Sequence, residues 1–559
     1  MITLGTNAVA KTLFVQAGDA ASEVYQLQSG TLTLADQLWV NSSTVNTYLN
    51  IGSGATVLAP NGTVGASSST NKNELTVDVG GALTVSGQLN VAYEGSSYAG
   101  LYVNGSATLG TLNVGGLATA NSASVYNYGT LNVGTLIFGD AGNSAYGGVW
   151  GGSTMTTGAT VIGNAVGADT NELDVLYGSQ WTSNGPLTIG KAGSSNSAYI
   201  GYGSDGYGTG TLTVTGSTSD IVVGEAAGAD SNFLVVNGTG STLTTQAALV
   251  VGKGGASNSA YVTYGASASV GLVRLGVDAG STGNSVTVSE EGSTLTVANT
   301  VRVGDKGSDN DLYIDNGGTV TLTGTGKNFY VGYEKSASNN SLFVSGTGSA
   351  LVMHDANADL VVSANQGSGS DSSGNEVAVQ SGGLLDVTRT LIGTGGTLTG
   401  YDGTIGGNTL VGAGGTISPG FSGGLPLGSL SFLGDVDLTN GGTLAIETGA
   451  SGASDFIDVA GSLLLAGSTL NLTVGVQDAG VAYVIAHYAT LVGQFATVNG
   501  LLGPSWHVDY NYRGLNEIAI VSDAASVPEI DPNSLGSVLA LVLGSLGLLE
   551  RRRLKAQVA

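Results

Sequence analysis

A short apolar pattern recurs along most of the chain and predicts its fold. The pattern is a pentad, Asn-x-(Leu/Val/Ala)-x-(Val/Ile), and its copies begin at Asn73, Asn121, Asn171, Asn196, Asn232, Asn258, Asn284, Asn310, Asn340 and Asn375. Two degenerate copies begin at Ala99 and Asn143. The step is 26 residues from Asn232 to Asn310 and ranges from 22 to 36 elsewhere. Repetition at such a period indicates a solenoid in which each repeat forms one structural unit.

Each repeat contains two further apolar bursts after the pentad. A Gly-containing turn precedes Leu-Thr-Val in Gly292–Val297, and a Val-x-Val-Gly segment follows at Val301–Gly304. Alternating apolar positions with Gly, Asn, Ser and Asp between them are typical of short strands joined by tight corners. A β-propeller fits less well, since its blades need about 40–45 residues and four strands. We therefore expect an all-β, right-handed parallel β-helix (solenoid) with about three strands in each coil.

The recurrent Asn has a structural role in this fold. A corner Asn tolerates left-handed backbone conformation and can hydrogen-bond to the Asn of the next coil. The β-helix is expected over residues 1–393. Residues 394–526 hold longer strand patterns and more aromatic residues near Trp506, which indicates final coils and a capping β region that covers the open edge.

The last segment, residues 527–559, has a different character. A short motif, Val527, Pro528 and Glu529, precedes an apolar run and a basic cluster, Arg551, Arg552 and Arg553. The run is expected to form one short C-terminal hydrophobic helix whose apolar positions are Leu535, Val538, Leu539, Leu541, Val542, Leu543, Leu546, Leu548 and Leu549. A 15-residue helix spans about 22 Å of a ~30 Å hydrocarbon core, and snorkelling arginines cover part of the difference. An amphipathic or buried helix is the alternative, but the run has no polar face.

The tail resembles the PEP-CTERM sorting signal of Gram-negative-type bacteria in its Pro-Glu motif, apolar segment and arginine cluster. It departs from that family at Ile530, where a second Pro is usual. The Asn repeats, the Gly-Thr-Ile-Ser-Pro-Gly segment that ends at Gly420 and the closing Trp506 region resemble autotransporter-passenger-like β-helix proteins. The resemblance implies export, transient membrane insertion of the helix, recognition by an exosortase-type enzyme, and release to the cell surface or exopolysaccharide matrix.

Composition narrows the possible functions. The formal net charge is −25, which argues against nucleic acid as a partner because phosphate binding requires basic surface. The chain has no Cys, so disulfides, thiolate nucleophiles and Cys-ligated metal centres are excluded. The first residues, from Met1, lack the basic and apolar regions of a signal peptide. Because a C-terminal membrane signal requires an exported chain, we hypothesise that the true start lies upstream.

Candidate catalytic residues are few. Before the tail the arginines are Arg274, Arg302, Arg389 and Arg513, and the histidines are His354, His487 and His507. They do not recur with neighbouring acids at a spacing that indicates one site, so neither catalysis nor a cofactor is expected. Asp305, Asp309, Asp311 and Asp315 form the densest acidic cluster. A solvated corner is favoured there over a calcium site, because a twelve-residue loop pattern and a closing Glu are missing.

Aromatic residues recur at strand positions Tyr199, Tyr261, Tyr313 and Phe343. They alternate with the Leu/Val set, so we expect an outward-facing ladder that either binds glycans or stabilises the strands. The overall hypothesis is an exported, non-enzymatic surface or matrix protein with a structural or adhesive role, which contacts exopolysaccharide. The alternatives are a carbohydrate-active β-helix enzyme, a polysaccharide lyase or hydrolase, and a membrane protein held by an uncleaved tail.

Overall fold

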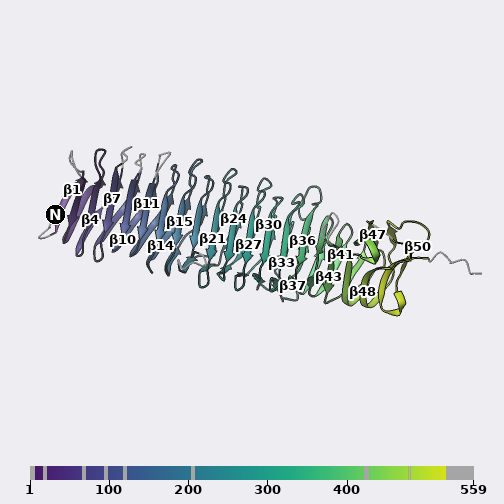
Figure 1. Ribbon diagram of the computed structural model, residues 1–559. Coiled ribbons are helices and arrows are strands. Elements are labelled where there is room, and N and C mark those ends of the chain that lie inside the picture. Colours follow the sequence, from purple (N-terminus) through teal and green to yellow (C-terminus); the bar gives the residue numbers. More distant parts are fainter. Residues whose placement is uncertain are drawn as a thin grey trace, which may run out of the picture.

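The chain forms an elongated parallel β-solenoid of about 18 turns (Figure 1). This computed structural model describes residues 7–16, 22–65, 71–92, 98–116, 122–202, 208–420, 427–475, 478 and 480–523. The predicted all-β parallel β-helix is confirmed. The sorting motif, the apolar segment and the arginine cluster lie outside the described residues. Within the described part of the chain, helices of the length and apolarity needed to cross a membrane are absent.

One sheet runs along the whole solenoid and holds the pentads. Each of its strands pairs in parallel with the strand one coil away, as β21 (Phe233–Asn237) does with β18 (Ser197–Ile200) and β24 (Ser259–Thr263). Its strands include β2 (Glu23–Leu27), β4 (Thr47–Ile51), β7 (Lys72–Val77), β9 (Tyr98–Val103), β11 (Ser122–Asn127), β13 (Tyr146–Val149), β15 (Glu172–Val175), β18 (Ser197–Ile200), β21 (Phe233–Asn237), β24 (Ser259–Thr263), β27 (Ser285–Ser289), β30 (Asp311–Asp315), β33 (Ser341–Ser345), β36 (Asn375–Gln380), β39 (Gly396–Gly400), β42 (Thr416–Pro419), β45 (Thr443–Thr448), β47 (Thr469–Val474) and β49 (Thr497–Asn499).

The second sheet changes its form along the chain. Most early coils contribute one long strand to it, namely β8 (Ala82–Val91), β10 (Ser106–Val114), β12 (Thr130–Phe138) and β14 (Thr154–Ile162). β14 then pairs with two short strands, β16 (Ser179–Ser183) and β17 (Leu187–Ile189). Later coils continue both short strands, as in β22 (Thr242–Thr245) and β23 (Ala248–Val251). The predicted three strands per coil therefore describe the middle of the solenoid better than its beginning.

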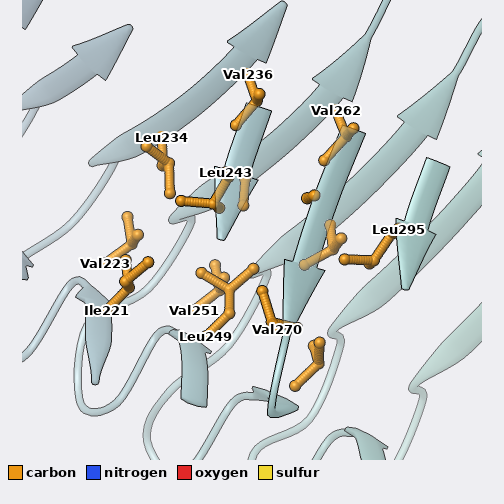
Figure 2. Close-up of a cluster of buried hydrophobic side chains, with 14 of the residues drawn as sticks. Ile221, Val223, Leu234, Val236, Leu243, Leu249, Val251, Val262, Val270 and Leu295 are labelled. Atoms are coloured by element: carbon orange, nitrogen blue, oxygen red, sulfur yellow. The ribbon is translucent and has the colours of Figure 1, made fainter. Parts of the chain in front are cut away.

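The interior is a stack of aliphatic side chains from all three strands of each coil. Leu234 and Val236 on β21, Leu243 on β22, and Leu249 and Val251 on β23 are at most 2% exposed (Figure 2). Alternate residues of a strand face opposite sides, so the intervening positions face solvent. Burying each such side chain contributes about 1.5–3 kcal/mol, and each coil interacts mainly with its two neighbours.

Antiparallel strands cover the C-terminal end of the solenoid. β46 (Phe456–Leu464) pairs in parallel with β48 (Tyr483–Val492), which pairs antiparallel with β51 (Glu517–Ser522). β50 (Trp506–Asp509) adds to β51, also antiparallel. The ring of Trp506 lies 6.1 Å from that of buried Tyr483. These strands pair the hydrogen-bonding groups that the last parallel edge would leave open. Two 3₁₀ turns, η1 (Ala450–Gly452) and η2 (Tyr512–Gly514), are the helical elements of the described residues.

Candidate functional site

The recurrent Asn residues form a buried ladder at one corner of the solenoid. The members are Asn171, Asn196, Asn232, Asn258, Asn284, Asn310, Asn340 and Asn375, and each is fully buried. In Asn232, for example, the backbone N–H and Nδ2 both donate to Oδ1 of Asn258, over 2.9 and 3.0 Å. The same pair of bonds links Asn258 to Asn284. The predicted hydrogen bonding between Asn residues of successive coils is confirmed, and it is structural.

The backbone at this corner differs from the prediction in one respect. The left-handed conformation falls on the residue before the Asn, with φ of 58° at Ser231 and 56° at Ser257. The Asn itself can then donate its backbone N–H to the neighbouring coil. Two of the predicted pentads are also out of register: Ala123 and Ala145 hold the column positions that Asn121 and Asn143 would need. Strand pairing sets this register, and sequence spacing alone does not.

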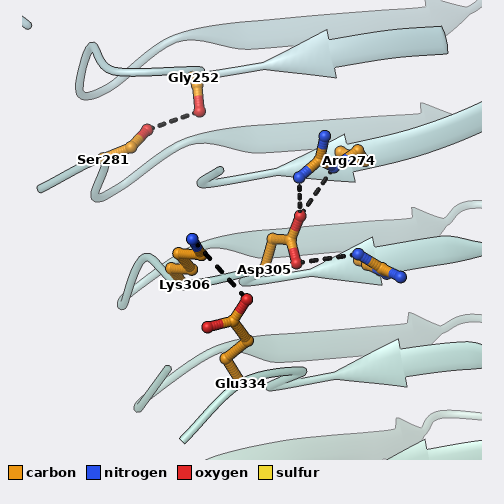
Figure 3. Close-up of polar contacts among 7 residues, drawn as sticks. Gly252, Arg274, Ser281, Asp305, Lys306 and Glu334 are labelled. Atoms are coloured by element: carbon orange, nitrogen blue, oxygen red, sulfur yellow. Dashed lines mark hydrogen bonds and ion pairs between the residues drawn. The ribbon is translucent and has the colours of Figure 1, made fainter. Parts of the chain in front are cut away.

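A glycine of the Val-x-Val-Gly segment packs against each ladder Asn. Gly252 has φ of +70°, and a Cβ added to it would lie 2.2 Å from Cγ of Asn284. Gly224 stands in the same relation to Asn258, with φ of +77°. The hydroxyl of Ser281 also donates to the carbonyl of Gly252, over 2.7 Å (Figure 3). Glycine is therefore required at this position for two reasons: it adopts a positive φ readily, and it has no Cβ to collide with the Asn side chain.

The charged residues form small, separate groups. Asp305 is 1% exposed and accepts hydrogen bonds from Arg274, which Figure 3 shows, and from Arg302. Strand pairing places Arg274 and Arg302 at matching positions on successive coils. The guanidinium of Arg302 also lies 3.7 Å from the ring centre of Tyr333. The expectation that Asp305 lies at a solvated corner is therefore wrong. Sequence spacing did not reveal that two arginines share this acid, because residues one coil apart become neighbours. Two guanidinium groups share this one carboxylate, so the group keeps a net positive charge, and the side chains of Arg274 and Arg302 are partly exposed.

Two other acids of the predicted cluster, Asp309 and Asp311, bind different partners. Asn339 donates to Asp309 over 3.1 Å, and the Tyr313 hydroxyl donates to Asp311 over 3.0 Å. The described residues contain no group of three His, Asp or Glu side chains placed to hold a metal ion.

The histidines lie in three separate pairs with acids, His354 with Asp386, His487 with Asp458, and His507 with Asp523. Arg389 binds Asp359 through two bonds of 2.6 and 2.9 Å, and Arg513 lies over the ring of Tyr512.

The predicted aromatic ladder faces outward but is interrupted. Tyr199, Tyr261, Tyr313 and Phe343 are half-buried and occupy one column of the pentad sheet, as expected. Val235 separates Tyr199 from Tyr261, and Thr287 separates Tyr261 from Tyr313. Tyr313 and Phe343 do stack, with ring centres 5.1 Å apart and planes 6° apart. A continuous ladder is therefore wrong, and a single stacked pair remains.

A larger aromatic cluster lies on the same sheet nearer the N-terminus. The rings of Tyr102 and Tyr126 stack at 5.1 Å, and Tyr126 lies 5.8 Å from Tyr146. Trp150 contacts Tyr126 and Tyr146, with ring centres 5.3 and 6.1 Å away. Sequence spacing did not predict this cluster. Tyr102 and Tyr126 lie in the column of Tyr199, but Tyr126 falls outside the Asn121 pentad, and Tyr146 and Trp150 lie outside that column. The recurrence of Tyr at 102 and 126, with Gly100 beside the first, is the signal that could have found it.

A hollow of about 290 Å³ lies beside this cluster. Strand pairing places Glu74, Gly100, Ser124 and Tyr146 in one column on four successive coils. Gly100 has no side chain and that of Ser124 is small, so the surface of the sheet is recessed between the larger side chains of Glu74 and Tyr146. Tyr102 and Tyr126, in the neighbouring outward column, form a wall of the hollow. Residues at or just before the strand starts form its rim, namely Lys72, Tyr98 and Ser144. We call this feature the aromatic hollow.

The electrostatics of the aromatic hollow favour neutral hydrogen-bonding groups. Burial raises the pKa of Tyr102 to about 12, and burial also raises the pKa of Tyr126, so both phenols are protonated at neutral pH. Burial raises the pKa of the Glu74 carboxyl, which the nearby Lys72 ammonium partly opposes. On the adjoining strand β15, burial raises the pKa of Asp174 to about 7. The Tyr146 hydroxyl donates to Asp174 over 2.6 Å, while Oδ1 of Asp174 is buried without a partner.

Comparisons with known proteins yield likenesses to solved structures, but none to family models or curated sequences. The crystal structure of a TibC-catalysed, hyper-glycosylated TibA fragment is similar over 78% of this chain and 94% of that chain, at 15% sequence identity and a TM-score of 0.20. At this identity and TM-score, the likeness carries no inference about the activity of this chain. The candidate site therefore rests on the geometry of the aromatic hollow.

Proposed function

We propose that the chain is an exported bacterial solenoid that acts as a structural or adhesive component of the cell surface or exopolysaccharide matrix, sorted by its PEP-CTERM-like tail. The observation that carries the proposal is the length of the solenoid itself. About 18 coils spaced ~4.8 Å apart make a rod of roughly 85 Å, and buried Asn hydrogen bonds stiffen its corner. A rod of this length can present an exposed binding site at a distance from the membrane or matrix to which the protein is attached.

The tail motif supports the destination. Val527, Pro528 and Glu529, the apolar segment and the Arg551 cluster would direct the chain into the membrane with the arginines in the cytoplasm. An exosortase-type enzyme would then cleave near Glu529 and release the solenoid. The acidic surface, with a net charge of −25 over the chain, suits solubility in that setting.

Mass spectrometry of the C-terminus in fractionated native cells tests the proposal. A chain that ends near Glu529 in the surface or matrix fraction is expected. Substituting Pro528→Ala together with Glu529→Ala should retain the chain through Ala559 in the membrane fraction. Pro532→Ala, outside the motif, is the matched control and should leave processing unchanged. An intact Ala559 in the wild-type membrane fraction would instead identify the tail as a permanent anchor, and a cytoplasmic chain would refute export.

A carbohydrate-active enzyme is the competing proposal, and the presence of Lys72 and Glu74 in one hollow favours it. Glycoside hydrolysis ordinarily requires two carboxyl groups about 5–9.5 Å apart on either side of the scissile bond. Glu74 is the one carboxyl among the described residues that line the aromatic hollow. We therefore favour the non-enzymatic role. Release of reducing ends or unsaturated uronates from polysaccharide, lost in Glu74→Gln, would establish the enzyme instead.

A further inference from the structure

The aromatic hollow has the shape of an elongated binding site. Glu74 and Tyr146 close its two ends, three coil steps or about 14 Å apart along the solenoid axis. Gly100 forms part of its floor, where an added Cβ would lie 2.8 Å from the Tyr102 ring and 3.3 Å from the Ser124 hydroxyl. The volume of about 290 Å³ lies at the lower end of the range for small-molecule sites. One or two sugar rings laid along the axis would fill it.

The chemistry of the walls is that of a carbohydrate site. Tyr102 and Tyr126 present aromatic carbon, and Tyr98 at the rim is 48% exposed. A pyranose ring has a C–H face that packs on aromatic carbon and hydroxyl groups at its edge. The Ser124 hydroxyl, the phenols and the Glu74 carboxyl supply hydrogen-bond donors and acceptors for those hydroxyls. The lining therefore combines aromatic carbon with placed polar groups, and sites that recognise small molecules also use placed polar groups to orient the ligand.

Charge selects among sugars. Among the described residues that line the hollow, the one cation that accompanies Glu74 is Lys72, which lies at the exposed rim. One more acid, Glu172, lies on the next strand and pairs with Tyr146. The chain as a whole carries −25, so an approaching polyanion is repelled at long range as well as in the site. An acidic polysaccharide is therefore disfavoured relative to an uncharged one.

We propose that the aromatic hollow binds an uncharged pyranose unit, or two linked units, of a polysaccharide. This inference rests on the proposed surface or matrix function and assigns it a ligand class and a site. The stacked pair of Tyr313 and Phe343 lies on the same sheet, but it is not among the residues that line the hollow. It provides an internal control, because it has aromatic rings in an outward column without this cavity.

Titration of the full-length chain with oligosaccharides tests the proposal. The probes are neutral hexose and N-acetylhexosamine oligomers, compared with uronic acid oligomers, followed by calorimetry and by the fluorescence of Trp150, which contacts Tyr126 and Tyr146. Saturable binding of at least one uncharged oligomer is expected, with uronates at least tenfold weaker. Absence of binding by every uncharged oligomer, or preference for uronates, would overturn the proposal.

Two variants locate the binding site. Ser124→Phe fills the floor of the hollow, and Tyr98→Ala removes an exposed ring from the rim, where truncation disturbs no core. Each should weaken binding at least tenfold, whereas Tyr313→Ala should leave it unchanged; circular dichroism checks that all three fold. Unchanged binding in both hollow variants would place the site elsewhere. This outcome is independent of the C-terminal processing experiment, so failure of the ligand assignment and failure of the surface function are distinguishable.

Discussion

Two regions of one solenoid solve the same packing problem differently. In the coils from Asn171 to Asn375, an Asn ladder fills the corner. In the coils around β9 to β13, Ala99, Ala123 and Ala145 hold the same column. The outer face differs too, because the early coils carry the aromatic hollow, while the later coils carry the stacked rings of Tyr313 and Phe343. The interior of the two regions is alike, with Leu and Val in register. Coil stacking therefore tolerates different corners and different outer faces as long as the apolar columns persist.

The largest effect is expected from a glycine of the ladder region. Gly252→Ala should lower the free energy of unfolding by about 4 kcal/mol, since it combines a positive φ with a Cβ that collides with Asn284. Gly280→Ala, where an added Cβ meets nothing within 4 Å, is the control and should change stability by less than about 1 kcal/mol. Urea denaturation of both variants measures the difference. Equal stabilities would show that the corner can relax.

Removal of one ladder side chain comes next. Asn258→Ala leaves the buried N–H and Nδ2 groups of Asn232 without their acceptor, and should cost about 3 kcal/mol. Hydrogen exchange should show faster opening of the coils on either side, because coils interact with nearest neighbours. Asn184→Ala, at an exposed corner outside the ladder, is the control. A local change no greater than in the control would remove the ladder as a source of stability.

The buried carboxyl of Asp174 should make the early region sensitive to pH. Burial raises the pKa of Asp174 from 3.8 to about 7, so the folded state holds a proton that the unfolded state releases above pH 4. Stability should therefore fall as pH rises from about 4 to 7 and then level off. Asp174→Asn keeps an acceptor for Tyr146 and should raise stability at pH 8 by about 2 kcal/mol while flattening this slope.

The control for this pH effect is Glu172→Gln on the same strand. Burial also raises the pKa of that half-exposed carboxyl, so a smaller change in the same direction is expected. Thermal melts across pH 4–8 provide the measurement. A slope in Asp174→Asn as steep as in the wild type would show that another group causes the dependence.

The smallest effect would come from extending the ladder into the early coils. Ala145→Asn places an amide beside Asn171, whose Oδ1 already accepts the backbone N–H of Ala145 over 2.9 Å. The residue that packs against Ala145 is Gly115, so the glycine that accompanies each ladder Asn is already present. We expect a gain of about 0.5–1 kcal/mol from one added hydrogen bond, measured by the urea midpoint. Destabilisation would mean that the early corner is too narrow for the amide.

Local patterns in the sequence were sufficient to predict the all-β fold, the repeat of the coils and the role of the corner Asn. Alternation of Leu and Val places one face of each strand inside, and a residue with small, polar, donor-and-acceptor character recurs where the chain must turn. Those features depend on residues within one coil. The same patterns were not sufficient for the register of the Asn121 and Asn143 copies, which are offset from the column that Ala123 and Ala145 occupy.

Contacts between coils were decided by the tertiary structure alone. Arg274 and Arg302 meet at Asp305, and Gly100 and Ser124 open a hollow between Glu74 and Tyr146, only because coils of different lengths stack in a particular register. The repeat varies from 25 to 36 residues between successive ladder Asn residues, so sequence distance does not reveal which side chains are neighbours. Thus sequence alone determined that this chain coils and where it turns. Parallel hydrogen bonding between coils determined which outward side chains meet, and with them the candidate site.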